Sequence, residues 1–402
     1  MSALNSSAVA PRASRVVALC FLVAVFEGFD IQSMGVAASG VAAEFHLRLG
    51  QLGLALAASV IGLAIGAAIG GRASDLVGRR IVLLLSMVGL GVFSFATTLA
   101  WDEGSLLGAR LLTGLALGSA FPNLIAAVAD STSLKQRPGG LALMYCGMPL
   151  GGIVAGLVAF GATQEAWRTI FYVGSLGPML VAPLLLLLPR GTTTDARVAS
   201  GQPAIDIGAV LFGERTRATL LIWVSYFFTL LFVYLLLSWL PSLLVVRGLG
   251  RQAGLLASVA LNGGAIVGSL VLGGLIVRGA YRQVVPLTYL GMAVSVGSLA
   301  VTSNQLIFVA AFFCGLFVIG GQLVLYAMTP HFYEHTDRGT GVGAAVAVGR
   351  LGSILGPILA GTLIGAGYTP AMVLLLAMPG LLIAFGAAVA LSRFTDPATI
   401  SG

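Results

Sequence analysis

Charged residues are scarce in this chain, since only 9% of its 402 residues are Asp, Glu, Lys or Arg. A soluble domain usually carries about 25% charge, so these residues cannot supply a water-facing surface. Histidine and cysteine are rarer still, with three of each. Because Cys20, Cys146 and Cys314 lie in apolar segments without motif spacing, we expect core residues and neither a disulfide framework nor a metal site. No cofactor is expected either.

Apolar residues, in contrast, make up 58% of the chain and recur in twelve long segments. A helix of roughly 20 residues crosses about 30 Å of hydrocarbon, and the segments reach about that length. They are too long and too evenly apolar for barrel strands, which predicts an all-α membrane protein. The expected spans are 16–41, 51–71, 81–100, 106–129, 139–162, 169–189, 218–241, 253–277, 284–302, 306–329, 340–366 and 371–392.

The charges in the loops indicate the orientation of the chain. Arginine and lysine are concentrated at the two ends of the chain and in the even-numbered loops, while the other side holds only Arg48, Arg168, Arg247 and Arg251. The positive-inside rule therefore places both termini in the cytoplasm. The net charge of +7 is explained by anchoring to the lipid bilayer, so no nucleic-acid partner is expected, and we expect a monomer.

A polar connection at residues 190–217 divides the chain into residues 1–189 and residues 218–402, each with six expected helices. Glycines and arginines recur between the two parts at an offset of 200 to 203 residues. The repeat predicts two pseudo-symmetric six-helix bundles. Transporters use such repeats to place a binding site between them, near the middle of the bilayer.

Two motifs resemble signatures of the major facilitator superfamily. The first is GGRASDLVGRR at residues 70–80, where glycines permit a tight turn and an acid can accept hydrogen bonds from a helix N-terminus or a loop arginine. The second is RLLTGLALGSAFPN at residues 110–123, whose glycines at steps of four give a helix a smooth face for close packing. We expect the first loop to stabilise one conformation, although basic anchoring alone is an alternative. The residues of that loop site are Gly71, Asp75, Gly78, Arg79 and Arg80.

Four ionisable residues, Glu27, Asp30, Arg110 and Arg350, fall well inside the expected spans. A central charge costs roughly 2.5 to 3.5 kcal/mol, so we expect these side chains to face one shared cavity. Glu27 and Asp30 share a helical face, where two like charges disfavour joint ionisation and could take up and release a proton. Alternatively, both acids are permanently ionised and paired with the two arginines.

Polar side chains in the spans suggest what that cavity binds. The planar guanidinium of Arg350, flanked by glycines, suits a carboxylate in two-point contact, although a purely structural arginine is also possible. Aromatic faces with hydrogen-bonding tips suit a ring that bears hydroxyl groups, with interhelical packing as the alternative. Besides Arg350, the candidate substrate-binding residues are Arg110, Asn123, Tyr145, Tyr234, Gln322 and Tyr326. Trp239 is expected to anchor the outer end of its helix.

FEGFDIQ, at residues 26–32, is similar to the first-helix signature of the aromatic acid:proton symporter family, although Glu27 replaces the usual aspartate. Residues 142–151, 226–241 and 340–352 also resemble that family, most closely its 3-(3-hydroxyphenyl)propionate transporter branch. The resemblance implies proton coupling by the acids of the first helix, and a role for the membrane arginines.

The resulting hypothesis is a symporter that imports aromatic carboxylates with protons across the inner (cytoplasmic) membrane of a bacterium by alternating access. One alternative is a proton-coupled antiporter that exports drugs or aromatic compounds, because the fold does not fix the direction. A membrane enzyme is a third reading. His331 and His335 have a metal-binding spacing, but a solvated loop explains them, and no enzymatic activity is expected.

Overall fold

The computed structural model describes residues 11–133, 136–188, 216–333 and 338–394, and every regular element in these ranges is a helix. The first half contains α1 (Pro11–Glu44), α2 (Leu49–Val77), α3 (Arg79–Thr98), α4 (Glu103–Ser131), α5 (Arg137–Gly161), α6 (Arg168–Val181) and the short helix η1 (Ala182–Leu187). The second half contains α9 (Thr216–Val246), α10 (Arg251–Val277), α11 (Tyr281–Val301), α12 (Ile307–Cys314), η2 (Gly315–Ile319), α13 (Gly320–Met328), η3 (Thr329–Phe332), α14 (Arg338–Gly365) and α15 (Pro370–Phe394).

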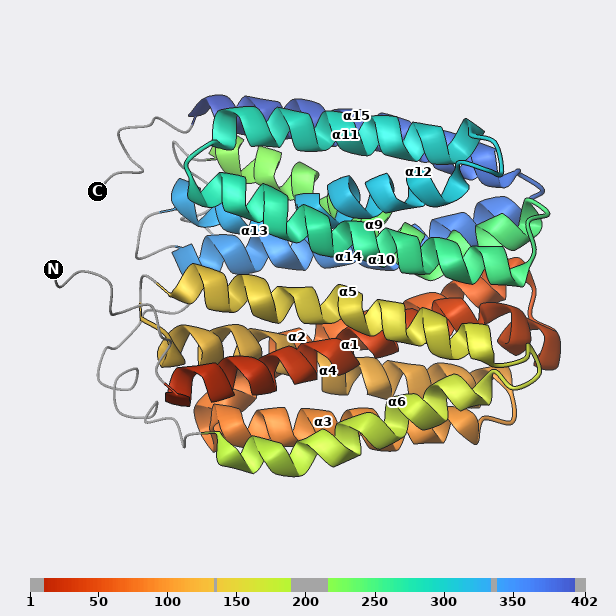
Figure 1. The fold of residues 1–402 in the computed structure, drawn as a ribbon, viewed down its shortest axis with the longest axis horizontal. Helices are drawn as coiled ribbons and strands as arrows, with labels where there is room; N and C mark the ends of the chain where they lie inside the picture. The colour runs from red at the N-terminus through yellow and green to blue at the C-terminus, as the bar shows by residue number, and fades with distance from the viewer. Residues whose placement is uncertain (1–10, 134–135, 189–215, 334–337, 395–402) are drawn as a thin grey trace, which may run out of the picture.

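The predicted all-α membrane fold is confirmed, because 12 helices among the described residues are long and apolar enough to cross a membrane. The tenth span, Ile307–Phe332, is made of four consecutive elements and contains the π-helical turn η2. Figure 1 shows that α1 begins and α15 ends at the same end of the molecule, as an even number of crossings requires. The three cysteines are free and buried, as expected of core residues.

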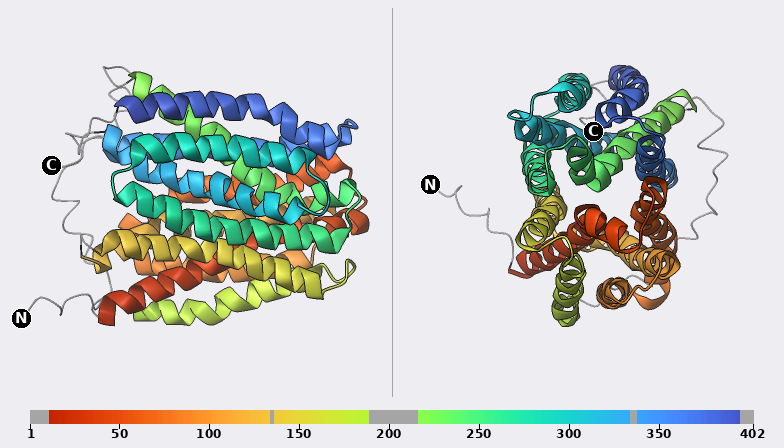
Figure 2. Two further views of the ribbon diagram at one scale, coloured as in Figure 1. Left: turned by 45° about the horizontal axis from the view of Figure 1, so that its top comes forward. Right: turned by 90° about the vertical axis from the view of Figure 1, so that its right-hand side faces the viewer.

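The helices pair in the same way in both halves of the chain. In the first half, α1 packs against α5, α2 against α4, and α3 against α6. Six spans later, α9 packs against α14, α10 against α12 and η2, and α11 against α15. The end-on view in Figure 2 shows the two sets as separate groups. Of the predicted 190–217 connection, residues up to 215 lie outside the described part, and α9 begins at Thr216.

The two groups meet mainly through α2 with α14, α5 with α10, and α1 with α9. Glu27 and Gln32 on α1, Asn262 on α10 and Arg350 on α14 are buried polar residues of these helices. Helices α3, α6, α11 and α15 lie at the outside of the groups (Figure 2). Polar groups at the centre avoid the cost of facing hydrocarbon. The fold thereby brings two of the four ionisable side chains, Glu27 and Arg350, to the boundary between the two bundles.

The glycines of the fourth-span motif let α4 approach α2 closely. A Cβ atom on Gly114 would lie 1.9 Å from the Ser59 carbonyl oxygen, and one on Gly118 would lie 2.1 Å from the Leu63 carbonyl oxygen. Small residues at such crossings allow the van der Waals contact that holds membrane helices together.

We therefore expect Gly114→Ala to lower the thermal stability of the detergent-solubilised protein strongly, because the two helix backbones must move apart. Gly108→Ala is the matched control, since it lies on the same helix and a Cβ there would have no atom within 4 Å. The control should be neutral or slightly stabilising, because alanine favours a helix over glycine by up to about 1 kcal/mol. Equal melting temperatures for the two variants would refute this packing argument.

The loop between α2 and α3 consists of Gly78, whose φ of 86° is one that residues with a Cβ rarely adopt. Arg79 forms an ion pair with Asp130 near the end of α4, a partner that the sequence did not indicate. The side-chain surroundings of Gly71 and Asp75 lie outside what the structure describes. The proposed role of this loop in conformational change therefore stays a prediction, as it does for Arg80.

Candidate functional site

A cavity lies between the two bundles, lined by side chains from α1, α4 and α5 on one side and from α9, α10, η2, α13 and α14 on the other. It holds about 760 Å³ of space between atoms, including its mouth. Six residues that were predicted to bind the substrate or to carry the proton line this cavity, namely Glu27, Tyr145, Tyr234, Gln322, Tyr326 and Arg350.

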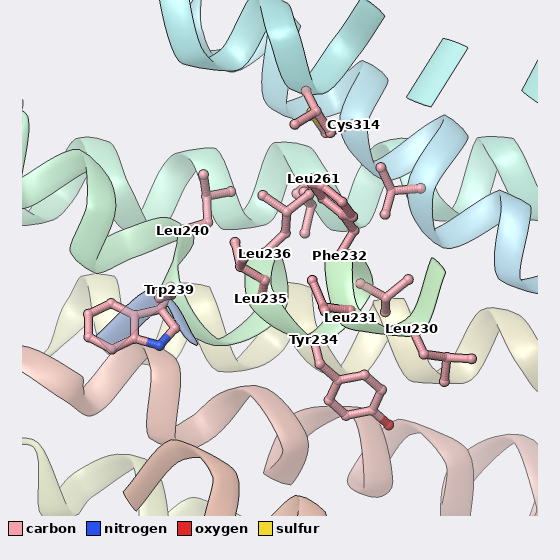
Figure 3. Packing of buried hydrophobic residues seen from close by; sticks show 14 of the residues in the cluster. Leu230, Leu231, Phe232, Tyr234, Leu235, Leu236, Trp239, Leu240, Leu261 and Cys314 are labelled. Atoms are coloured by element: carbon pink, nitrogen blue, oxygen red, sulfur yellow. The ribbon is translucent and has the colours of Figure 1, made fainter. Parts of the chain in front are cut away.

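Arg350 is the basic group of this cavity. Its Nη1 donates a hydrogen bond of 2.8 Å to the Tyr234 hydroxyl, while its Nε has no partner. Figure 3 shows the Tyr234 ring pointing from α9 toward the ribbon of α1, away from the leucines on the other face of α9. No carboxylate lies within 4.0 Å of Arg350 among the described residues. The guanidinium therefore retains hydrogen-bonding capacity for an anion.

Glu27 is the acidic group of the same cavity. Its side chain is buried, with 1% of its surface exposed, and its Oε2 has no hydrogen-bond partner. No basic group lies within 4.0 Å of it in the described part of the chain. Gly28 beside it brings α1 so close to α5 that a Cβ would lie 1.9 Å from the Met148 carbonyl oxygen. A buried carboxyl group without a partner is costly when ionised and much less so when protonated.

Asp30 and Arg110 do not line this cavity, which differs from the expected shared chamber. Arg110 is fully buried and donates to both carboxylate oxygens of Asp30, from Nη1 at 3.0 Å and from Nη2 at 2.9 Å. The Ser94 hydroxyl adds a third hydrogen bond to Asp30, also of 3.0 Å. The guanidinium also lies 5.3 Å from the centre of the Phe171 ring. The pairing of an acid with an arginine that the sequence suggested is therefore present for Asp30 and Arg110. Both residues of this ion pair belong to the N-terminal bundle.

We expect Asp30→Asn and Arg110→Met each to reduce stability by about 3 to 5 kcal/mol, because each leaves a buried charge without its partner. The double variant Asp30→Leu/Arg110→Met removes both charges and should recover much of this loss. Unfolding of the detergent-solubilised proteins by heat or denaturant measures the effect. If the double variant were as unstable as the sum of the single variants, the pair would not be the reason for the loss.

Two other residues, Asn123 and Trp239, also have surroundings that differ from those predicted. Asn123 does not line the cavity, and its amide donates 2.8 Å to the Ser119 carbonyl oxygen of its own helix. Trp239 is fully buried instead of lying at the membrane interface, and its Nε1 donates 2.9 Å to the Pro357 carbonyl oxygen of α14. Trp239 therefore joins α9 to α14 within the C-terminal bundle.

Tyrosines from both bundles form an aromatic wall of the cavity. The rings of Tyr145 on α5 and Tyr326 on α13 stack with centroids 6.5 Å apart, and Phe121 meets Tyr145 edge-on at 5.6 Å. Gln322 donates a hydrogen bond of 3.0 Å to the Tyr326 hydroxyl. Offset aromatic faces of this kind can pack against a planar ring. The tenth span brings Gln322 and Tyr326 to this place directly after its π-helical turn.

Gln32 on α1 and Asn262 on α10 also line the cavity, and both are uncharged polar residues within apolar spans of the sequence. Their amide groups bond to one another across the boundary between the bundles. The signal that could have identified them is their rarity, because an amide in an apolar span needs a partner. Sequence alone does not pair residues 230 positions apart.

Close contacts between the bundles gather at the end opposite to the start of α1. Arg251, at the beginning of α10, donates to the Ala162 and Ala159 carbonyl oxygens at the end of α5, at 2.9 and 2.7 Å. A Cβ on Gly361 of α14 would lie 2.6 Å from the Leu49 carbonyl oxygen at the start of α2. These contacts hold the two bundles together at that end.

The chain resembles known transporters along almost its whole length. A family model described as Major Facilitator Superfamily matches residues 20–279 and 251–402. The 3-(3-hydroxy-phenyl)propionate transporter of Escherichia coli (strain K12) is 42% identical over an alignment that covers 96% of this chain and 95% of that protein. The gallate transporter of Pseudomonas putida is 32% identical, with 94% and 90% covered.

Solved structures of transporters share the arrangement of the helices. The xylose transporter XylE from E. coli, in an inward open conformation, matches with a TM-score of 0.74 and 15% identity over 96% of both chains. The nucleoside transporter NupG matches with a TM-score of 0.74 and 12% identity, over 96% of this chain and all of that one. At such low identities the likeness concerns the fold alone.

Proposed function

Because the chain belongs to the Major Facilitator Superfamily, we propose that it imports an aromatic carboxylate together with a proton across the cytoplasmic membrane of a bacterium. The resemblance of its loop and fourth-span motifs to this superfamily is confirmed by the membership, and the resemblance to aromatic acid transporters is confirmed by the relative that is 42% identical. Its relatives are named as transporters of 3-(3-hydroxyphenyl)propionate, gallate and 4-hydroxybenzoate. Each of these compounds carries a carboxylate and a hydroxylated ring, which suits the cavity described above.

The observation that carries this proposal is the presence of Glu27 and Arg350 in one cavity without an ion pair between them. When Arg350 binds the substrate carboxylate, these two charges cancel. An ionised Glu27 would then leave a net negative charge in a medium of low dielectric constant, which is strongly unfavourable. A proton on Glu27 removes that charge, so binding of the anion and of the proton favour one another.

Asp30 and Arg110 have a different role in this proposal. Their charges already cancel, and their hydrogen bonds fasten α1 to α4. Glu27 therefore carries the proton and Arg350 holds the carboxylate, while the Asp30–Arg110 pair positions the helix that bears Glu27. The sequence alone suggested that both acids carry the proton and that both arginines bind the substrate. In this proposal one acid and one arginine have these roles.

The electrical cost of import also favours a coupled proton. Carrying a monoanion into a cell with a negative interior costs about 2.3 kcal/mol per 100 mV, and one accompanying proton cancels that cost. With the arginine-rich end of the molecule in the cytoplasm, the Arg251 and Gly361 contacts close the outer end. Alternating access would break these contacts and form new ones at the cytoplasmic end, where the Gly78 turn lies.

Uptake of labelled 3-(3-hydroxyphenyl)propionate into proteoliposomes tests the proposal. A more acidic outside should drive accumulation, and a more acidic inside should not. Liposomes without the protein control for passive entry of the protonated acid. Accumulation driven by an acidic inside would indicate a proton antiporter. Uptake that does not depend on the pH gradient would contradict the symport proposal.

A further inference from the structure

The amides of Gln32 and Asn262 form a closed pair at the boundary between the bundles. Gln32 Nε2 donates 3.0 Å to Asn262 Oδ1, and Asn262 Nδ2 donates 2.7 Å to Gln32 Oε1. Both side chains are buried and both line the cavity. Neither takes part in the binding of carboxylate or proton argued above.

A third helix, α5, leaves space for this pair of amides. A Cβ on Gly152 of α5 would lie 1.9 Å from Gln32 Nε2 and 2.6 Å from Asn262 Oδ1. The absence of a side chain at Gly152 leaves the space that the two amides occupy. The pair is therefore built from α1, α5 and α10, with helices of both bundles around it.

The two amides can still form hydrogen bonds with one more polar group. Asn262 Nδ2 also donates 2.8 Å to the Ser258 carbonyl oxygen, so both of its N–H groups are used. Gln32 Nε2 has a second N–H group, for which the described residues provide no acceptor, and each amide oxygen can accept a further bond. A phenolic hydroxyl both donates and accepts one hydrogen bond, so it matches this remaining capacity.

The position of the pair fits the far end of a ring-bearing acid. Gln32 follows Glu27 by five residues on α1, which is about 7.5 Å along the helix axis. A substrate whose carboxylate lies at Arg350, near Glu27, would extend its ring along the cavity toward Gln32. Building on the function proposed above, we infer that the Gln32–Asn262 pair is the subsite that recognises the ring hydroxyl of the substrate.

The expected selectivity is moderate. Sites whose polar groups are left unpaired reject an analogue that lacks a hydroxyl by factors of about 10⁴. Here the two amides satisfy one another when no hydroxyl is present, so that penalty is largely absent. We expect the protein to bind 3-(3-hydroxyphenyl)propionate about tenfold more tightly than 3-phenylpropionate, which corresponds to one net hydrogen bond.

Equilibrium binding of these two acids to the purified protein and its variants tests the inference. Gln32→Met keeps the length of the side chain and Asn262→Leu keeps its approximate shape, while both remove the amide. Each variant should lose the preference for the hydroxylated acid, with the two dissociation constants approaching one another, and should still bind 3-phenylpropionate. Retained binding of that acid also reports that the variant is folded. Gln164→Met is the matched control, because Gln164 is an exposed residue outside the cavity.

The outcomes separate recognition from a structural role. An equal loss of affinity for both acids in the Gln32 and Asn262 variants would mean that the pair only joins the bundles, and the inference would be wrong. An unchanged preference in both variants would also overturn it. If the unaltered protein bound neither acid, the proposed function itself would fail, which is distinguishable from the other two results.

Discussion

Arg350→Gln is expected to weaken binding of an aromatic carboxylate by about 30-fold or more, because truncating one member of a buried, hydrogen-bonded charge pair costs about 2 to 5 kcal/mol. The side chain lies in the cavity, bonded to the Tyr234 hydroxyl and free of any carboxylate in the described part of the chain. Binding of labelled substrate to the purified protein measures the loss.

Arg350→Lys distinguishes charge from geometry. Lysine keeps the positive charge but lacks the planar fork that bonds a carboxylate at two points, so its affinity should lie between those of Arg350→Gln and the unaltered protein. Arg278→Gln is the control, because Arg278 is exposed just beyond the end of α10, away from the cavity. Unaltered affinity in Arg350→Gln would mean that the carboxylate binds elsewhere.

Glu27→Gln should abolish accumulation of substrate against its gradient while leaving exchange of labelled for unlabelled substrate largely intact. Glutamine mimics the protonated carboxyl group and cannot release a proton, so transport loses its driving force but not its binding site. A gradient of one pH unit corresponds to about 1.4 kcal/mol, which supports about tenfold accumulation by a one-proton symporter. In Glu27→Gln, the accumulation ratio should fall to about 1.

Glu165→Gln is the matched control, since Glu165 is exposed between α5 and α6 and should accumulate substrate normally. Asp30→Asn provides a second comparison, because its main effect should be on stability rather than on coupling. The opposite result would be folded Asp30→Asn protein that exchanges substrate but does not accumulate it, together with normal accumulation in Glu27→Gln. It would mean that Asp30, and not Glu27, carries the proton.

Much of the fold could be predicted from the sequence because the bilayer imposes strong constraints on a chain. Long apolar segments must be helices, and the polar midpoint and the repeated glycines indicated two related halves. The close approach of α4 to α2 at Gly114 and Gly118 follows the glycine spacing directly. The π-helical turn after Cys314 was not predicted, because it depends on how the tenth span packs against α10.

The candidate site was less predictable, because it depends on the rotation of each helix. Glu27 and Asp30 are three residues apart, which turns them about 60° from one another around α1. That rotation is enough to direct Asp30 to Arg110 and Glu27 into the cavity. The sequence pattern places the four ionisable residues inside the spans, where the structure buries them. Only the packing of α1 against α4, α5 and α9 decides which acid is paired.

The movement of protons on addition of substrate tests the central claim most directly. Proteoliposomes that enclose a pH-sensitive dye, at equal pH on both sides, would receive 3-(3-hydroxyphenyl)propionate from outside, with protein-free liposomes as the reference for passive entry. The account predicts that the interior becomes more acidic faster than in the reference, and that Glu27→Gln removes this difference. Alkalinisation of the interior, or an unchanged rate with the unaltered protein, would contradict it.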